Sequence, residues 1–488
     1  MIEVKDFSFR YQGSDQMVLD HINLIIHPGE WLLIRGLSGC GKSTLALALA
    51  GFLGKVIPGH CNGEILIDQR NIQELEAHEI SERIFLVQQN PENQFCTLTV
   101  KDELAFGLEN RLLPENVIKQ RILTALAAVQ ATSLFDRRLD ELSGGQQQKI
   151  AIATALALQP DVLILDEPTS NLDPDSLQNL INVLDGLRSS IKLSVVIIEH
   201  RKEILSDLIS RHLEIREAKL VETKAMTFDK TPKNNLKSQS ALKKDNREIL
   251  LEVDNLSVNY DGVKALGINR FALHSGEIIS LMGSNGSGKT TLLLSLLGLI
   301  ESNCQSKKIF GRVFSGKIPK YVMASVGLAF QNPDHQIFCD SVKKEVCFGP
   351  ENYGSQDISA KWIHEILETF GFCAMTDKHP FLLSFGQKGR LNLASILSYQ
   401  PRILLLDEVF IGQDADNVLF ILNTVREYVD ERGAGAIFVN HMPNPVLNYS
   451  DRLIFLENGK MVIDCIPINA FREFELIGKS NWLGVAND

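Results

Sequence analysis

Two glycine-rich segments of the chain each end in a lysine followed by a hydroxyl residue, which is a pattern that binds phosphate. They read GLSGCGKST at 36–44 and GSNGSGKTT at 283–291. The glycines let backbone N–H groups approach phosphate oxygens, and the following helix points its positive N-terminus at them. Lys42 and Lys289 are therefore expected to reach the β- and γ-phosphates of ATP, and Ser43 and Thr290 to ligate Mg²⁺.

The remaining positions of each loop are expected to contact the nucleotide as well. They are Gly36, Ser38, Gly39, Gly41 and Thr44 in the first loop, and Gly283, Asn285, Gly286, Gly288 and Thr291 in the second. Each loop stands between a short apolar run and a helical apolar pattern, which is the strand–loop–helix context that such a loop requires. At an effective dielectric of 20, two unit charges 4 Å apart interact by roughly 4 kcal/mol, so a lysine and a metal ion matter greatly for a triphosphate.

Two further apolar runs end in an Asp-Glu pair, VLILDE at 162–167 and ILLLDE at 403–408. Such a run predicts a buried strand that presents both carboxylates at its end. Asp166 and Asp407 are expected to hold Mg²⁺, directly or through water, while Glu167 and Glu408 orient or deprotonate the attacking water. Alone, such a pair is mostly structural; its place 118–124 residues after a loop lysine favours the chemical role.

A histidine ends one more apolar run in each half of the chain, IIEH at 197–200 and FVNH at 438–441. A single histidine at a strand end is more often structural than catalytic. Because the arrangement occurs twice, we expect His200 and His441 to contact the γ-phosphate.

These motifs recur in one order at nearly one offset, which indicates a duplicated domain. Lys289 follows Lys42 by 247 residues, and Asp407 follows Asp166 by 241. The polar stretch 226–248 between the copies reads as a flexible linker, although its six Lys/Arg against three Asp/Glu left a nucleic-acid-binding arm as an alternative. The predicted domains are 1–225 and 249–488.

Apolar strand-like runs alternate with helical patterns in each copy, which predicts an α/β fold with a parallel sheet and crossover helices. Between the second and third repeated motifs the pattern is mainly helical. There Ile118, Ile122 and Leu126 recur at four-residue spacing. We interpret this stripe as the core of a helical subdomain.

Bulk composition narrows the function classes. The 488 residues carry a net charge of −11 with a pI near 5.6, which argues against broad binding to nucleic acid or anionic lipid. Eight cysteines without a CxxC pair favour a reducing compartment over a zinc site or a disulfide framework. Neither a signal peptide nor an 18-residue apolar span is expected, so the chain is predicted to have no membrane span of its own.

The segment LSGGQ at 142–146, with LSFGQ at 383–387, resembles the signature of ATP-binding-cassette (ABC) ATPases, and the likeness covers nearly the whole chain. The resemblance implies two tandem P-loop domains, each with a RecA-like parallel-sheet core, a small antiparallel β subdomain and a helical subdomain. It also implies that Tyr11 and Tyr260 stack on adenine, although both lie in β-like segments where sheet packing is an alternative. Gln89 and Gln331 match the glutamine that contacts nucleotide and Mg²⁺.

The resemblance further implies that each nucleotide lies between the phosphate loop of one copy and the signature of the other. Site one would combine Lys42, Glu167 and His200 with Ser384 and Gly386. Site two would combine Lys289, Glu408 and His441 with Ser143 and Gly145. The second copy departs from the pattern at Phe385, Val409, Phe410 and Gln413. Because these elements face site one, we expect site one to turn over more slowly.

The glutamine segments point to one branch of the family. QNPENQF at 89–95 is followed by FGLEN at 106–110, and QNPDHQIF at 331–338 by FGPEN at 348–352. Both resemble the ATPase subunits of energy-coupling-factor (ECF) importers of vitamins, vitamin precursors or metal ions. This implies a peripheral protein at the cytoplasmic face of the membrane, bound to an integral-membrane T subunit that works with a substrate-binding S subunit.

Two alternatives remain at this point. One is a soluble tandem ABC protein acting on ribosomes; the short linker, the run Ser170-Asn171-Leu172-Asp173 and the acidic charge count against it. The other is a fused ATPase of a conventional ABC importer, against which the FGxEN segments argue.

Overall fold

The structure is a computed structural model of the chain. It describes residues 1–37, 39–170, 172–190, 192–199, 205, 208–223, 247–260, 262–314, 318–353, 359–410, 413, 415–440, 448–479 and 482. The chain divides into two compact units, Met1–Asp229 and Lys230–Asp488, and each is described by itself. None of the helices in the described ranges has the length and apolar character that crossing a lipid bilayer requires.

A six-stranded sheet forms the centre of the first unit. Its order is β10 (Lys219–Thr223), β9 (Arg211–Arg216), β3 (Trp31–Arg35), β8 (Ser194–Ile198), β7 (Val162–Asp166) and β6 (Ile84–Val87). All neighbours run parallel except β10 and β9. A second, antiparallel sheet has the order β2 (Leu19–Ile26), β1 (Ile2–Tyr11), β4 (Gly59–Ile67) and β5 (Arg70–Asn71).

The helices of the first unit fall into those beside the parallel sheet and those of a helical layer. They are α1 (Lys42–Leu49), α2 (Ala77–Arg83), α3 (Val100–Asn110), α4 (Glu115–Ala128), α5 (Gly144–Leu158) and α6 (Pro174–Ser190), with 3₁₀ turns η1 (Pro91–Gln94), η2 (Thr132–Leu134) and η3 (Leu139–Glu141). The predicted helical stripe is confirmed as core, because Ile122 and Leu126 are buried and Ile118 packs against them.

The second unit repeats this architecture. Its six-stranded sheet has the order β16 (Val326–Ala329), β17 (Ile403–Asp407), β18 (Gly435–Val439), β13 (Ile278–Gly283), β19 (Arg452–Glu457) and β20 (Lys460–Cys465). Only β20 runs antiparallel to its neighbour. The antiparallel sheet has the order β12 (Val263–His274), β11 (Ile249–Tyr260), β14 (Ser306–Ile309) and β15 (Arg312–Val313).

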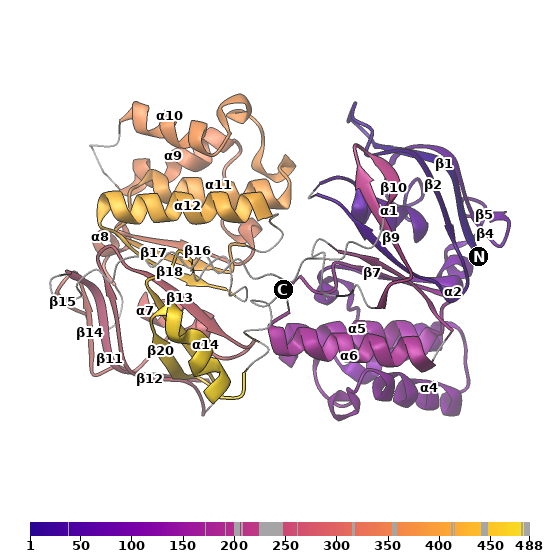
Figure 1. Cartoon of the computed structure of the whole chain (residues 1–488), viewed down its shortest axis with the longest axis horizontal. Helices are drawn as coiled ribbons and strands as arrows, with labels where there is room; N and C mark the ends of the chain where they lie inside the picture. The colour runs from indigo at the N-terminus through magenta and orange to yellow at the C-terminus, as the bar shows by residue number, and fades with distance from the viewer. Residues whose placement is uncertain are drawn as a thin grey trace. The chain divides into compact units, whose positions relative to one another are not determined.

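Figure 1 shows the helical layer of the second unit on one side of its six-stranded sheet and the antiparallel sheet on the other. The helices described in the whole second unit are α7 (Lys289–Leu296), α8 (Lys320–Met323), α9 (Val342–Tyr353), α10 (Ala360–Thr369), α11 (Phe385–Ser398), α12 (Ala415–Arg432) and α14 (Pro467–Leu476). Its 3₁₀ turns are η6 (Pro333–His335), η7 (Cys373–Met375) and η8 (Pro380–Leu382).

Each six-stranded sheet is buried on both faces. In β3, Trp31 and Leu33 pack into the cluster shared with the helical layer, whereas Leu32 and Ile34 pack into the cluster shared with the antiparallel sheet. The two-residue alternation of a strand produces this division. It explains why the central strands read as continuous apolar runs.

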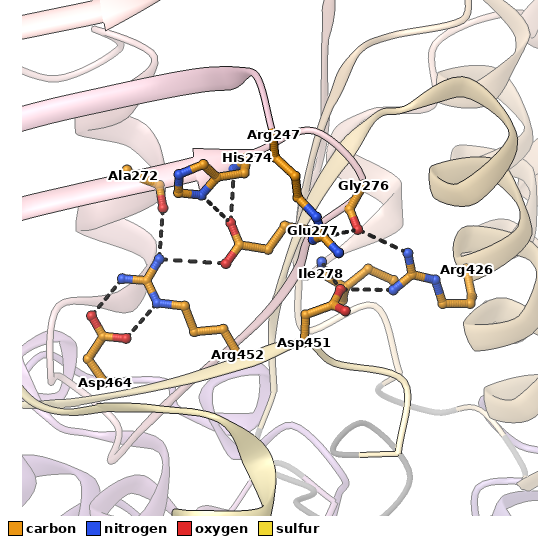
Figure 2. A network of polar contacts seen from close by, with 10 residues as sticks. All are labelled: Arg247, Ala272, His274, Gly276, Glu277, Ile278, Arg426, Asp451, Arg452 and Asp464. Carbon is orange, nitrogen blue, oxygen red and sulfur yellow. Dashed lines mark hydrogen bonds and ion pairs between the residues drawn. The ribbon is translucent and has the colours of Figure 1, made fainter. Parts of the chain in front are cut away.

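Polar side chains fasten the edge of the second unit's sheet (Figure 2). Arg452 donates through Nε and Nη2 to both carboxylate oxygens of Asp464 on β20, and through Nη1 to the carbonyl of Ala272 on β12 at 3.0 Å. The same guanidinium lies 3.6 Å from the carboxylate of Glu277, whose side chain is only 6% exposed. One arginine thus joins three strands to the turn that precedes β13.

The C-terminal segment, for which the sequence offered no motif, covers the outer strands β19 and β20. Phe474 of α14 and Trp482 are both buried. Their rings pack edge-on to Phe455 of β19, at centroid distances of 5.0 and 4.9 Å. The segment therefore completes a small separate core of the second unit.

Candidate active site

The phosphate loops join a central strand to a helix, and their glycines have conformations that other residues rarely adopt. Gly41 and Gly288, directly before α1 and α7, have φ of 103° and 99°. A Cβ on Gly41 would lie 2.7 Å from the carbonyl oxygen of Val18, and one on Gly283 would lie 2.3 Å from that of Leu456. Tight turns and close backbone approach thus both require glycine here.

The loop lysines are buried and turned into their own loops. Lys42 Nζ donates to two loop carbonyls, that of Gly36 at 2.9 Å and that of the next residue at 3.0 Å. Lys289 Nζ makes the same pair of bonds, to Gly283 at 2.8 Å and to the next residue at 3.0 Å. A cation therefore lies beside the N-terminus of each helix, which is the arrangement that attracts phosphate.

The strand-end aspartates meet the hydroxyl residues that follow these lysines. Thr290 Oγ1 donates to Asp407 Oδ2 at 2.8 Å, and the Ser43 side chain makes the matching hydrogen bond to Asp166. Burial, with a smaller contribution from the charge of Glu167, raises the pKa of Asp166 from 3.8 to about 6. The phosphate loop and the strand-end carboxylate are thus brought together in both units.

These groups fit a magnesium ion. Asp166 Oδ1 is buried and accepts no hydrogen bond within the described part of the chain, so an acceptor stands ready for a cation. A carboxylate beside a hydroxyl is a donor set that Mg²⁺ prefers, with the remaining positions filled by phosphate oxygens and water. When bound, Mg²⁺ would neutralise charge on the phosphates. Asp166, Ser43, Asp407 and Thr290 are the residues that would hold it.

The glutamates after these aspartates have a strained backbone in both units. Glu167 has φ of 48° and Glu408 has φ of 50°, in the left-handed region that side chains with a Cβ rarely adopt. Each is held there by its own N–H, which donates to the end of the neighbouring strand, at Ile198 O (2.8 Å) and Val439 O (3.0 Å). Such conformations cost roughly 1–3 kcal/mol and cluster at functional sites.

The predicted glutamines contact these glutamates. Gln89 Nε2 donates to Glu167 Oε2 at 2.9 Å, and Gln331 Nε2 donates to Glu408 Oε2 at 3.1 Å. The remaining amide oxygen of each glutamine is the atom that could ligate Mg²⁺. A carboxylate that could accept a proton from water and an amide that orients this carboxylate are therefore adjacent in each unit.

The loop that carries Gln89 and the loop that carries Gln331, here called the glutamine loops, each contain a second glutamine that was not singled out from the sequence. Gln94 Nε2 donates to the carbonyl of Leu86 at 2.7 Å, and its Oε1 accepts from the N–H of Gln88 at 2.7 Å. Gln336 makes the equivalent pair of bonds in the second unit, at 2.7 and 2.9 Å. These amides fold the loop back onto its strand. The recurrence of QNPxxQ in both copies was the available signal.

Each unit also has a buried glutamate that was not singled out from the sequence. Glu103 on α3 accepts two backbone N–H bonds from the end of the first loop, both at 3.0 Å. Glu345 on α9 accepts the corresponding bonds in the second unit, from Phe338 at 3.2 Å and Cys339 at 2.8 Å. Each fastens the glutamine loop to a helix of the helical layer.

The signature serines cap helices. Ser143 is the N-cap of α5 and Ser384 is the N-cap of α11, each in a reciprocal capping box with the glutamine three residues on. Phe385 occupies the first helical position without altering this start. Among the described residues, no hydrogen bond links either serine to the phosphate loop of its own unit.

The other departures of the second copy are accommodated locally. Phe410 is buried and stacks on Phe438 at a centroid distance of 5.2 Å, where the first copy has Thr169 bonded to Glu199. Gln413 donates to the carbonyl of Gly386 at 3.1 Å, at the start of α11, which is the signature helix of the second unit.

The two tyrosines that the resemblance places at adenine have different surroundings in the two units. Tyr11 hydrogen-bonds to Thr44 of the phosphate loop at 3.0 Å, and its ring packs edge-on to Phe9. Tyr260 is 50% exposed at the end of β11. Ser38, His200 and His441 lie outside the described residues.

The chain is similar to known proteins over nearly its whole length. The ABC transporter family matches residues 19–170 and 267–410, once in each unit. YkoD of Bacillus subtilis, named as an HMP/thiamine import ATP-binding protein, is 30% identical over 97% of this chain and 93% of its own length. A protein of Methanosarcina acetivorans named as an ABC transporter ATP-binding protein is 34% identical, over 95% and 90%.

A solved structure shares the tandem fold. The archaeal ribosome recycling factor aABCE1, in complex with the ribosomal stalk protein aP1, aligns over 97% of this chain and 92% of its own with a TM-score of 0.59. At 20% identity this likeness concerns the fold alone.

Proposed function

This chain belongs to the ABC transporter ATPase family, and we propose that it energises an ECF-type importer of a vitamin, a vitamin precursor or a metal ion. Its two units are both ATP-hydrolysing cassettes by family membership. The importer assignment rests on one observation, the glutamine segment that recurs in both units with the QNPxxQ and FGxEN elements. The name of the Bacillus relative, which refers to import of HMP/thiamine, supports the same class.

The proposed chemistry follows from the contacts within each unit. The loop lysine and the helix N-terminus bind the phosphates, and the strand-end aspartate with its hydroxyl partner holds Mg²⁺. Glu167 and Glu408, each oriented by a glutamine, accept a proton from the attacking water. In this proposal His200 and His441 contact the γ-phosphate.

In this proposal the signature serine of each copy would complete the site of the other copy. As the family resemblance implies, Ser384 and Gly386 would close on the nucleotide held by Lys42, and Ser143 and Gly145 on the one held by Lys289. A helix start suits this role, because the helix dipole presents partial positive charge to a phosphate.

The partner in the membrane would dock beside the glutamine loops. In the second unit Phe338 and Phe348 are 61% and 41% exposed and form an edge-on pair at 4.6 Å. In the first unit Phe106, at the position matching Phe348, is 48% exposed, and nearby Leu98 is 68% exposed. Exposed apolar side chains next to a nucleotide-linked loop suit a surface that receives the apolar face of an amphipathic helix.

Co-purification of a tagged chain from native membranes tests the proposal. We expect a polytopic T subunit and a small S subunit to co-purify, and Phe106→Asp with Phe348→Asp to abolish this while binding of a fluorescent ATP analogue persists. Leu476→Asp, at an apolar position on α14 that is 71% exposed and thus more exposed than either phenylalanine, serves as the control that keeps the partners.

Two outcomes contradict the proposal. Recovery of ribosomal RNA in place of membrane proteins would support the soluble alternative. Recovery of a conventional importer's permease with a soluble binding protein would replace the ECF-type assignment.

A further inference from the structure

Two side chains of the signature helix fasten the glutamine loop of the second unit. Lys388, in the first turn of α11, donates from Nζ to Asp334 Oδ1 at 2.7 Å, and the lysine side chain is only 13% exposed. One turn later the buried Asn392 donates from Nδ2 to the carbonyl of Pro333 at 3.1 Å and lies 3.4 Å from Gln336 Oε1. Residues four apart share one helix face, so both contacts hold the same loop.

The first unit lacks this fastening at the matching positions. Gln147 takes the place of Lys388 and donates weakly to the carbonyl of Leu139 at 3.5 Å. Ala151 takes the place of Asn392. Glu92, which corresponds to Asp334, is exposed and makes no ion pair within the described part of the first unit.

The fastened loop carries the glutamine that contacts the candidate base. Gln331 stands three residues before Asp334, and its amide donates to Glu408 Oε2 at 3.1 Å. A charge-assisted bond with fixed geometry at one end of so short a segment limits how far the other end can move. The aromatic ring of Phe381, 5.1 Å from Lys388 Nζ, further restricts the ammonium group.

We propose that Lys388 is a positioning residue for ATP hydrolysis in the second unit: through Asp334 it holds Gln331 against Glu408. Orientation of the base in this unit thereby depends on the signature helix. The first unit orients Glu167 through Gln89 without such a link. This inference concerns the ATPase reaction of the chain alone and does not depend on which membrane partner it serves.

The test measures turnover in a Glu167→Gln background, where the remaining activity depends on Glu408. Lys388→Gln copies the first unit's residue and should lower kcat about tenfold, a fraction of the roughly 100-fold that a 1 Å misplacement costs. KM for ATP should stay unchanged, because the phosphate loop is untouched. The charge-swapped variant, Asp334→Lys with Lys388→Asp, should restore kcat to within about threefold, since the ion pair is re-formed.

Two controls distinguish positioning of Gln331 by Lys388 from a general effect of Lys388 on helix α11. Gln147→Ala, at the matching position of α5, should leave kcat within about twofold. In a Glu408→Gln background Lys388→Gln should cause no further loss; an equal loss there would overturn the proposal, because the lysine would then act through the signature serine.

Hydrogen exchange provides a second, activity-independent measurement. Lys388→Gln should speed amide exchange of residues 331–336 about tenfold and leave residues 89–94 unchanged. Unchanged exchange at 331–336, or a loss of kcat that the charge swap fails to restore, would refute the positioning role.

Discussion

Replacing Asp166 by asparagine is predicted to stabilise the nucleotide-free chain while abolishing its activity. The carboxyl is buried and its pKa is raised to about 6, so the folded state binds this proton more tightly than the unfolded chain, where the pKa is near 3.8. The stability that this group contributes is therefore full below about pH 4 and is lost as the pH rises through about 6. Asparagine cannot ionise and removes this cost.

The magnitude follows from the pKa rise. A change from 3.8 to about 6 corresponds to roughly 3 kcal/mol at pH 8 and to roughly half of that at pH 5. For a unit of 150–250 residues each kcal/mol moves Tm by about 2–4 °C, so Asp166→Asn should raise the first unit's Tm by about 6–12 °C at pH 8.

Calorimetry in EDTA without nucleotide, at pH 5 and pH 8, tests this prediction. The gain in Tm should shrink by about half at the lower pH. ATPase activity with Mg²⁺ should fall to background, because the cation loses a charged ligand. A lower Tm at pH 8, or a gain that is the same at both pH values, would refute the reasoning that ionisation of this carboxyl destabilises the fold.

Three further predictions concern the two sites and the second unit. Glu408→Gln should reduce ATP turnover more than Glu167→Gln in steady-state assays, since the site of Glu167 is expected to be slower; equal losses would contradict the asymmetry. Arg452→Met should destabilise the second unit by about 3–5 kcal/mol, because its bonds to Asp464 and Ala272 are lost and the buried Glu277 keeps only its contacts with His274; urea unfolding measures this, and a loss below about 1 kcal/mol would count against it. Trp482→Ala should cost about 3–5 kcal/mol in the same assay, and a neutral result would mean that the C-terminal segment does not add to the core.

The phosphate loops could be predicted from the sequence because the residues that form them are close together in the chain. Glycines, lysine and hydroxyl stand within nine consecutive residues, and the strand and helix on either side are set by apolar patterns of their own. The duplication was equally plain, because repeated motifs at a constant offset need no knowledge of three-dimensional contacts.

Only some of the residues that shape the glutamine loops, residues 88–97 and 330–339, could be predicted from the sequence. Gln89 and Gln331 were identified by resemblance, but Gln94 and Glu103 were not, although both hold the loop in place. Nothing in a one-dimensional pattern distinguishes a buried glutamate that accepts two N–H bonds from an exposed one. The burial and the bond partners appear only when helix and loop are packed together.

The sequence by itself determined the phosphate chemistry, the strand-end carboxylates and the twofold repeat, because each is written in short segments whose conformation follows from nearby residues. Only the tertiary structure showed which side chains connect these segments to one another. Lys388 and Asp334 are 54 residues apart, as Arg426 and Asp451 are 25 apart, and only folding brings such charges within 3 Å of each other. Distances of that kind depend on how helices and sheets pack, which is a property of the whole unit and not of any one segment.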